Sequence, residues 1–419
     1  MILIVFILLL LAILGMPLFA VLGAGGLVAS YNAEVSPVSL IIELYRLASQ
    51  GNLVAIPLFT FAGMLMAAGG APQRLIKLFD ALLGWMPGGL AIVTIVVCAF
   101  FTAFTGASGV TIIALGGLLY PLFMQAHYAD RFSLGLLTSS GSLGLLFPPS
   151  LAILLYGIVA GVNIDELFLA GALPGIVLLI LLSTYSYFSA TKWHIQPHEI
   201  SIEKILQALK TSTWDILLPI GIVIGIFGGF VTITEAAALT AAYALFIESY
   251  IFREINLTND LYKILADTAK LVGSILVILG IAMGLTNLLI DAQIPMKLLD
   301  LVESKIDSQL QFLLLMNLFL LIVGAMMDIF SAIIVVVPLI LPIAHRYQID
   351  PVHLGIIFLA NLEIGYMTPP VGINLFIASQ RFGKSILTLF RAALPFLLIM
   401  LLWLLMISYV PQLTLWWKD

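Results

Sequence analysis

The chain has 419 residues, of which 62% are hydrophobic and only 9% are charged, and its mean hydropathy is +1.18. Soluble globular domains carry about 25% charged residues, so this composition excludes a soluble protein. The formal net charge of −5 argues against a nucleic-acid-binding function, which needs a basic surface.

Apolar runs of about 20 residues, the length that crosses a bilayer as an α-helix, recur along the chain. The first run, ILIVFILLLLAILG, does not alternate apolar and polar residues as a membrane β-strand would. The sequence therefore predicts an all-α, multi-pass membrane protein whose first span is retained, because no basic segment precedes it. The predicted spans cover residues 2–29, 53–69, 89–105, 108–124, 167–188, 215–230, 235–252, 268–290, 309–327, 330–345 and 385–410.

Two further apolar regions, 132–162 and 353–383, are interrupted near the middle by Pro148-Pro149 and Pro369-Pro370. Each half of about 15 residues would make about 22 Å of helix, which is shorter than the roughly 30 Å hydrocarbon core. We expect each region to fold back on itself as a re-entrant helical hairpin. One continuous kinked helix in each region is the alternative.

Two stretches, 74–84 and 296–305, combine helical apolar periodicity with charges on one face. This pattern predicts helices that lie in the plane of the membrane interface. Ordinary loop helices would show the same pattern.

Many residues recur at a constant distance of 221 positions, which we call the repeat offset and which predicts two structural repeats. The matching pairs are Gly63 with Gly284, Ile112-Ile113 with Ile333-Ile334, Pro121 with Pro342, Gly144 with Gly365, and Pro148-Pro149 with Pro369-Pro370. We therefore divide the chain into four parts. These are an N-terminal helix and connection at 1–52, a first repeat at 53–190, a connecting region with two membrane helices at 191–267, and a second repeat at 268–419.

The charges that flank the two interrupted regions differ in sign. Those around the first are mainly acidic (Asp130, Arg131, Asp165, Glu166), and those around the second are mainly basic (Arg346, Asp350, Arg381, Lys384). Because positive charge favours one side of the membrane, this asymmetry predicts that the two regions enter from opposite faces. The repeats are therefore expected to be inverted, with the absolute orientation left open.

Breaking a helix inside the membrane frees backbone N–H and C=O groups, which is costly unless they line a cavity or bind something. Freed carbonyls and hydroxyl groups suit Na⁺, and the N-termini of the half-helices after each proline pair suit a carboxylate. The segments FTGASGVT (104–111) and GAMMDIFS (324–331) are expected to face the interrupted regions. Close helix packing through small residues is the other explanation for both segments.

Several segments together resemble the large membrane subunit of tripartite ATP-independent periplasmic (TRAP) transporters, over almost the whole chain and in the same order. They are IPLFTFAGMLM (56–66), MPGGLA (86–91), PPS (148–150), LFLAGALPG (167–175), VTITEAAA (231–238) and NLEIGYMTPPVGINLF (361–376). The resemblance implies a sodium-coupled importer of an organic acid that works by an elevator movement in the bacterial or archaeal cytoplasmic membrane. It also implies two partners, a small TRAP membrane subunit and a periplasmic substrate-binding protein.

The resemblance further implies which residues form the sites. One Na⁺ site would use Ser108, Ser140, Gly141 and Gly144, and the other would use Gly324, Asp328, Gly365 and Thr368. The carboxylate substrate would contact Pro149, Ser150, Pro370 and Asn374. The first site departs from the family pattern, because Leu145 replaces a proline and Val110 replaces a hinge serine that could have been a ligand.

Three acidic residues lie within apolar sequence: Glu235, Asp328 and Glu363. Placing an aspartate at the centre of a membrane helix costs about 2.5–3.5 kcal/mol on insertion scales. Glu363 could hold a cation or couple ion movement to transport, and a structural hydrogen bond is the other explanation. Glu235 is expected at a helix N-terminus, where the helix dipole stabilises a carboxylate.

The sequence contains no HExxH, CxxC, GxSxG or P-loop motif, so it predicts neither an enzyme nor ATP hydrolysis. A sodium–dicarboxylate symporter that needs no binding protein is the main alternative to a TRAP permease. An ion channel is a weaker alternative, because paired helix breaks are a feature of carriers.

Overall fold

The computed structural model is all-helical. It describes residues 16–32, 51–192, 200–293 and 308–418, with short pieces between 7 and 49 and single residues at 296 and 306. Within these residues, seven helices are long and apolar enough to cross a membrane, or up to nine if each of two bent pairs counts as one span. The prediction of an all-α, multi-pass membrane protein is confirmed.

The helices follow one another with short connections. In the first part of the chain they are α2 (Leu18–Asn32), η1 (Gly51–Val54), α4 (Ala55–Ala68), α5 (Ala71–Leu83), α6 (Gly89–Thr105), α7 (Ser108–Gln125), α8 (Asp130–Ser140), η2 (Leu143–Leu146), α9 (Leu151–Ala160) and α10 (Ile164–Lys192). In the second part they are α11 (Ile202–Phe227), α12 (Ile233–Phe246), the π-helical η3 (Ile247–Ile251), α13 (Asp260–Asp291), α15 (Gln309–Met326), α16 (Ile329–Arg346), α17 (Pro351–Gly365), α18 (Ile373–Phe382), α19 (Ile386–Tyr409) and η4 (Pro411–Leu413).

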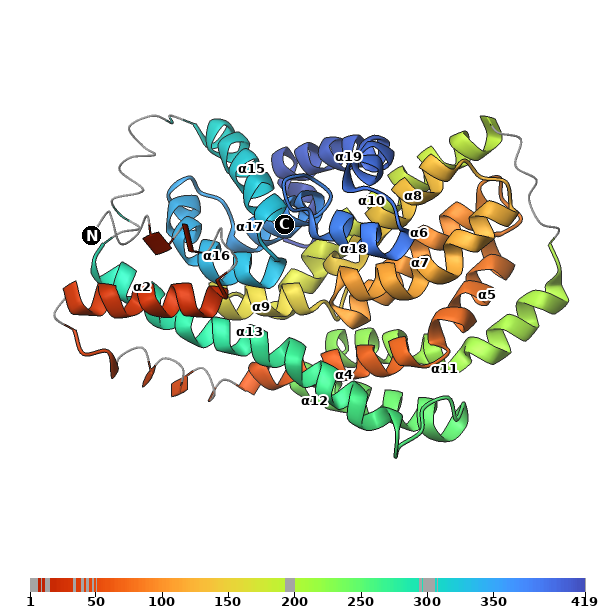
Figure 1. Cartoon of the computed structure of the whole chain (residues 1–419), viewed down its shortest axis with the longest axis horizontal. Helices are drawn as coiled ribbons and strands as arrows, with labels where there is room; N and C mark the ends of the chain where they lie inside the picture. Colours follow the sequence, from red (N-terminus) through yellow and green to blue (C-terminus); the bar gives the residue numbers. More distant parts are fainter. Residues whose placement is uncertain are drawn as a thin grey trace.

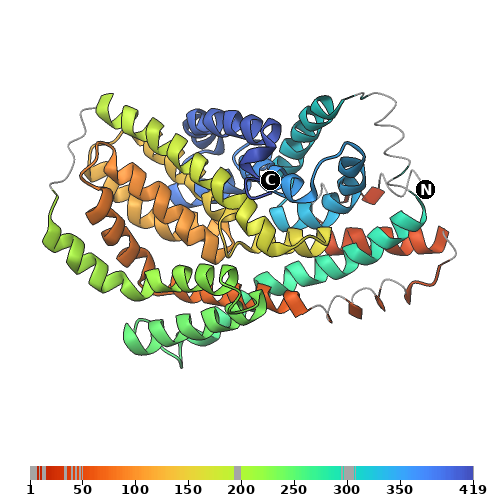
Figure 2. The same cartoon turned by 180° about the vertical axis from the view of Figure 1, so that it is seen from behind.

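The helices form two layers, which Figures 1 and 2 show from opposite sides. The α4 layer consists of α2, α4, α11, α12 and α13, and the α6 layer consists of α6 to α10 and α15 to α19. The layers meet where α4 packs on α6 and where α13 packs on α16. Helix α5 bridges them, because it packs on α11 on one side and on α6 on the other.

The described helices match the predicted spans from 53–69 onward, usually within three residues at each end. Helices α11 and α13 are the exceptions: they begin at Ile202 and Asp260, whereas the predicted spans begin at 215 and 268. The first ten residues of α11 are rich in polar side chains, which hid this extension of the helix. Residues 2–6, 9 and 12–15 of the predicted span 2–29, and nearly all of the amphipathic stretch 296–305, lie outside the described residues.

The two regions that were predicted to form hairpins are both interrupted at their proline pairs. At Pro148-Pro149 the chain bends by 46° between the α8–η2 segment and α9, and α8 and α9 are not packed against each other. Helices α17 and α18, on either side of Pro369-Pro370, are not packed together either. Both regions, which we call the broken spans, are therefore interrupted at their proline pairs, as predicted, and the re-entrant hairpin geometry stays a prediction.

The chain folds back one segment earlier, at the stretches that were expected only to face the hairpins. Helices α6 and α7 pack against each other on either side of Gly106 and Ala107. Gly106 has φ +63°, a left-handed conformation that glycine adopts without steric cost and that reverses the chain direction. Helices α15 and α16 also contact each other, although less extensively, and Met327 and Asp328 between them have extended backbone instead of a left-handed turn.

The repeat offset also relates the helix boundaries of the two halves. Shifted by this offset, the first residue of α7, Ser108, falls on Ile329, which is the first residue of α16. The starts of α15, α17, α18 and α19 lie within one residue of the shifted starts of α6, α8, α9 and α10. The two halves of the α6 layer therefore have the same sequence of elements.

Candidate functional site

A cavity of about 500 Å³ lies where the two fold-back turns meet the α4 layer. Its wall includes Gly106 and Ser108 from the first turn, Asp328 and Ile329 from the second, and Tyr366 from the broken span after α17. The N-termini of α7 and α16 therefore open onto one cavity, although they lie in different halves of the chain. A larger hollow of about 620 Å³ between α5, α6 and α7 contains none of the predicted site residues.

In the first half, the break in the span 132–162 packs directly on the end of α6. A Cβ atom added at Gly144 would lie 2.1 Å from the carbonyl oxygen of Ala99 and 2.4 Å from the amide nitrogen of Ala103. A Cβ atom added at Gly141 would lie 3.3 Å from the carbonyl oxygen of Ser108. The structure thus brings Ser108, Gly141 and Gly144 together, as predicted, and only glycine fits at 144.

Two threonines that the sequence analysis missed hold this contact. The Thr102 hydroxyl donates a hydrogen bond of 2.8 Å to the carbonyl oxygen of Gly141 and lies 2.7 Å from the Thr111 hydroxyl. A signal was present in the sequence, because hydroxyl residues occur at every third position across the turn, at 102, 105, 108 and 111. Residues three apart share a face of a helix, so this spacing predicts one hydroxyl-bearing face at the end of α6 and another at the start of α7.

In the second half, the corresponding contact joins Gly365 to Gly324. A Cβ atom added at Gly365 would lie 2.5 Å from the carbonyl carbon of Gly324. The carbonyl oxygen of the next residue, Ala325, accepts hydrogen bonds of 3.1 Å from the amides of Val371 and Gly372. The Thr368 hydroxyl donates 2.8 Å to the carbonyl oxygen of Gly365. Gly324, Gly365 and Thr368 are therefore close together, as predicted.

Asp328 is already engaged by the chain. It caps the N-terminus of α16, where one carboxylate oxygen accepts from the amides of Phe330 and Ser331 at 3.0 Å and the other accepts from the Ser331 hydroxyl. The remaining amide, on Ile329, donates 2.5 Å to the hydroxyl of Tyr366, a residue that the sequence analysis missed. Tyr366 thus ties the broken span to the second fold-back turn.

The four predicted substrate contacts are not gathered in one place by any described contact. Ser150 is buried at the N-terminus of α9, where its hydroxyl accepts from the amide of Ile153 at 3.4 Å, and Pro149 is buried beside it. Pro370 is exposed. Asn374 is buried on α18, with its amide nitrogen 3.5 Å from the carbonyl oxygen of Thr138 on α8.

Oxygen atoms without a hydrogen-bond partner among the described residues collect near both breaks. They belong to Ser140, Ser142, Asn361, Glu363 and Asn374. The repeat offset relates Ser140 to Asn361 and Ser142 to Glu363, so each half has two such side chains just before its break. Buried polar atoms are normally satisfied, so unsatisfied ones gathered at matching positions indicate a site for a ligand.

Glu363 differs from the other four because it is ionisable. Both of its carboxylate oxygens lack a partner, and the side chain is fully buried. The structural hydrogen bond that was the other explanation for this residue is therefore absent within the described part of the chain. Glu235, in contrast, forms the expected cap of α12, because its carboxylate accepts from the Thr232 amide at 2.8 Å.

All of these donors are oxygen atoms, which are the ligands that hard cations prefer. Within the described residues, no group of three or more histidine, cysteine, aspartate or glutamate side chains is arranged to hold a metal ion. The donor set suits a hard cation and lacks the thiolate and imidazole ligands that soft transition metals prefer.

Comparison with known proteins gives one consistent result. The family model for the DctM component of tripartite ATP-independent periplasmic transporters matches residues 3–413. The chain is 36% identical over 379 residues to a C4-dicarboxylate TRAP transporter large permease protein of Pseudomonas aeruginosa, covering 90% of this chain and 88% of the relative. It is 33% identical over 402 residues to the isethionate TRAP transporter permease protein DctMQ of Oleidesulfovibrio alaskensis, covering 95% of this chain but only 63% of that longer relative.

A solved structure shares the fold. The YdaH transporter of Alcanivorax borkumensis superposes with a TM-score of 0.62 over 89% of this chain and 87% of its own, at 15% sequence identity. At this identity the likeness concerns the architecture alone.

Proposed function

Because the chain belongs to the DctM family, the large permease component of TRAP transporters in the bacterial inner membrane, we propose that it is the translocating subunit of a sodium-coupled importer. As a permease it is not an enzyme. The cargo is an organic acid that a periplasmic binding protein delivers, and Na⁺ moves with it. A small TRAP membrane subunit completes the transporter, and the longer relative named DctMQ supports a role for such a subunit.

The transport movement is an elevator movement of the α6 layer against the α4 layer. The helix boundaries that match at the repeat offset support two structural repeats, at 53–190 and 268–419, with scaffold and connecting segments at 1–52 and 191–267. The signs of the flanking charges are the support for their being inverted. The contact between the layers is made by α4 on α6 and α13 on α16. A layer built from two symmetric halves presents its central site to each side of the membrane in turn.

Two Na⁺ sites lie at the paired breaks. The first uses oxygens from Ser108, Ser140, Gly141 and Gly144, with Thr102 and Thr111 holding the contact. The second uses Gly324, Gly365 and Thr368, with Asp328 at its edge as the cap of α16. The observation that carries this proposal is the set of unpartnered oxygens at matching positions beside both glycine contacts. Glu363 is the one carboxylate among them and is proposed to take part in ion coupling.

The substrate anion binds in the cavity of about 500 Å³ between the two fold-back turns. The N-terminus of α7, which has no side-chain cap, opens onto it, and its helix dipole favours a carboxylate there. The N-terminal amides of α16 are already bonded by Asp328 and Tyr366. The names of the relatives, which concern C4-dicarboxylates and isethionate, support a small organic anion. Pro149, Ser150, Pro370 and Asn374 remain predicted contacts for the same anion.

Reconstitution into proteoliposomes tests this function. The chain, its small subunit and its binding protein are expected to take up the ligand of the binding protein when Na⁺ is higher outside, and not when K⁺ replaces Na⁺. Uptake that persists without the binding protein would favour the self-sufficient symporter. Uptake that is independent of Na⁺ in every arrangement would contradict the proposal.

A further inference from the structure

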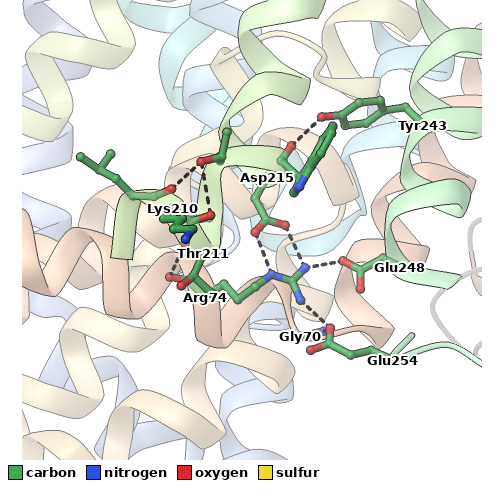
Figure 3. A network of polar contacts seen from close by, with 12 residues as sticks. Gly70, Arg74, Lys210, Thr211, Asp215, Tyr243, Glu248 and Glu254 are labelled. Carbon is green, nitrogen blue, oxygen red and sulfur yellow. Dashed lines mark hydrogen bonds and ion pairs between the residues drawn. The ribbon is translucent and has the colours of Figure 1, made fainter. Parts of the chain in front are cut away.

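Arg74 on α5 is the centre of a buried ionic cluster outside the candidate site (Figure 3). Its Nε and Nη2 atoms donate 2.8 and 2.9 Å to the two carboxylate oxygens of Asp215 on α11. Nη2 also lies 2.6 Å from Glu248 in η3, and Nη1 lies 2.5 Å from Glu254, just beyond η3. Only 6% of Arg74 is exposed, so three carboxylates surround one desolvated guanidinium group.

Further contacts fix the same helix in place. The Ser212 hydroxyl on α11 donates 3.1 Å to the carbonyl oxygen of Arg74. The amide of Gly70 donates 2.6 Å to Glu254, and the guanidinium group stacks 3.6 Å above the ring of Phe252. A planar guanidinium group can meet several carboxylates and a ring at once, which a lysine ammonium group cannot do. The cluster therefore holds α5 through its side chain and its backbone.

The partners of Arg74 lie on one side of α5 only. They belong to α11 and to the 248–254 turn after α12, which are parts of the α4 layer, whereas the other side of α5 packs on α6. The chain bends by 74° between α4 and α5, and it enters α6 through Gly88, which has φ +79°. Helix α5 is thus the covalent link between the layers, and its ionic contacts bind it to one of them.

Other described ion pairs stay within one layer in the same way. Lys384 pairs with Asp130, and Lys418 pairs with Glu166 and Asp350, all within the α6 layer or its ends. Where α4 meets α6, the contact is a close backbone approach, because a Cβ atom at Gly63 would lie 2.3 Å from the carbonyl oxygen of Phe104. That contact involves no ion pair, whereas the buried, hydrogen-bonded cluster around Arg74 specifies one geometry for α5.

We propose that Arg74 is a positioning residue that keeps α5 fixed to α11 and to the 248–254 turn while the α6 layer moves. This inference rests on the proposed transport function, because it concerns the movement that transport requires. The pivot then lies after α5, in the turn that contains Gly88, and not between α4 and α5. Without the cluster, α5 moves together with α6, so the α6 layer no longer turns about a fixed pivot.

Cross-linking tests the inference directly. Cys98 is the only cysteine, so a Cys98→Ser parent allows chosen pairs to be introduced. Lys77 on α5 and Lys204 on α11 line the same hollow of about 340 Å³. In the pair K77C/K204C, bridging the two cysteines with a bis-maleimide is expected to leave Na⁺-driven uptake within twofold of the unbridged protein. Loss of uptake on bridging would show that α5 moves on α11 and would overturn the inference.

A pair across the layers is the matched control. Ser274 on α13 and Ile334 on α16 line the cavity from opposite layers, so bridging S274C/I334C is expected to abolish uptake. If that bridged pair transports normally, the layers do not move against each other, and the inference fails. If the Cys98→Ser protein without introduced cysteines shows no Na⁺-driven uptake, the proposed function is contradicted, and so is the inference that rests on it. If the unbridged K77C/K204C protein takes up substrate but loses uptake when α5 is bridged to α11, the inference is refuted while the proposed function stands.

Variants of Arg74 give a second test. Arg74→Met is expected to lower the turnover rate of uptake at least tenfold while the half-saturating Na⁺ concentration stays within twofold. Bridging K77C/K204C in the Arg74→Met protein is expected to restore turnover, because the covalent link replaces the ionic one. Normal turnover in Arg74→Met would contradict the positioning role. So would a folded Arg74→Met protein whose turnover is not restored by bridging K77C/K204C. If Arg74→Met does not fold, Asp215→Asn, which keeps the shape, serves for the same comparison.

Discussion

Gly365 packs on Gly324 so closely that a Cβ atom added at Gly365 would lie 2.6 Å from the Cα atom of Gly324. The two glycines join the break in the second broken span to the second fold-back turn, where the second Na⁺ site is proposed. Gly144 makes the equivalent contact with the end of α6 in the first half.

The first prediction concerns this glycine contact. Gly365→Ala forces backbone atoms apart, which costs about 1–3 kcal/mol for an overpacked interior, and it is expected to lower the thermal unfolding midpoint and to abolish Na⁺-driven uptake. Gly221→Ala on α11 is the control, because a Cβ atom there meets nothing within 4 Å. Equal behaviour of the two variants would show that the close approach has no functional role.

The second prediction concerns the hydroxyl that ties α6 to the first break. Thr102→Val keeps the shape of the side chain but removes the hydrogen bond to Gly141, which is worth about 1 kcal/mol. We expect the half-saturating Na⁺ concentration for uptake to rise about fivefold, which is the factor that corresponds to this energy. Thr184→Val, whose hydroxyl bonds only within α10, should leave this concentration unchanged.

The third prediction concerns Glu363. A buried carboxylate without a partner destabilises the protein unless a cation is bound, so Glu363→Gln is expected to raise the unfolding midpoint in Na⁺-free detergent solution. The additional stabilisation that Na⁺ confers should be smaller in this variant than in the wild type. Glu203→Gln, at an exposed position of α11, is the control. If Na⁺ raises the unfolding midpoint by the same amount in the wild type and in both variants, Glu363 takes no part in ion binding.

The fourth prediction concerns pH. Burial opposes ionisation of Glu254, but hydrogen bonds from Arg74 and the Gly70 amide outweigh it, so the pKa of this carboxyl is held below its ordinary value of 4.5. A carboxyl with a lowered pKa contributes its stability in full above pH 4.5, and the contribution is lost as the pH falls below that value. Glu254→Gln should therefore be less stable than the wild type at pH 7, and the difference should shrink as the pH falls below 4.5. A difference that does not change between pH 7 and the most acid pH at which the protein stays folded would contradict the role of the charge.

The helices themselves could be predicted well from the sequence. The length of each apolar run and the positions of glycine and proline locate the ends of α6, α7, α15 and α16 within a residue or two, because these features act locally. The direction of the chain at a break is a different matter. A left-handed glycine does not settle it, because one lies at the α6–α7 turn (Gly106) and another at the second break (Gly372), whereas the α15–α16 turn has none. The hairpin geometry at the two proline pairs therefore stays a prediction.

The candidate site could be predicted in part. Gly144 and Gly365 were assigned to the sites because the resemblance to TRAP permeases implies them, and the repeat offset relates the two residues to each other. Tyr366 was missed because its role, bonding the amide of Ile329, depends on a contact between two helices. Arg74 was expected on the polar face of an interfacial helix, and it is buried instead, because its partners Asp215 and Glu254 lie 141 and 180 residues away.

The central claim is that oxygen atoms at the two breaks bind the coupling ion. The most direct measurement is the Na⁺ dependence of uptake in proteoliposomes for the wild type, Ser108→Ala and Thr368→Ala, with protein folding checked in parallel. We predict that each folded variant needs a severalfold higher Na⁺ concentration for half-maximal uptake. An unchanged Na⁺ dependence in both variants would contradict the claim.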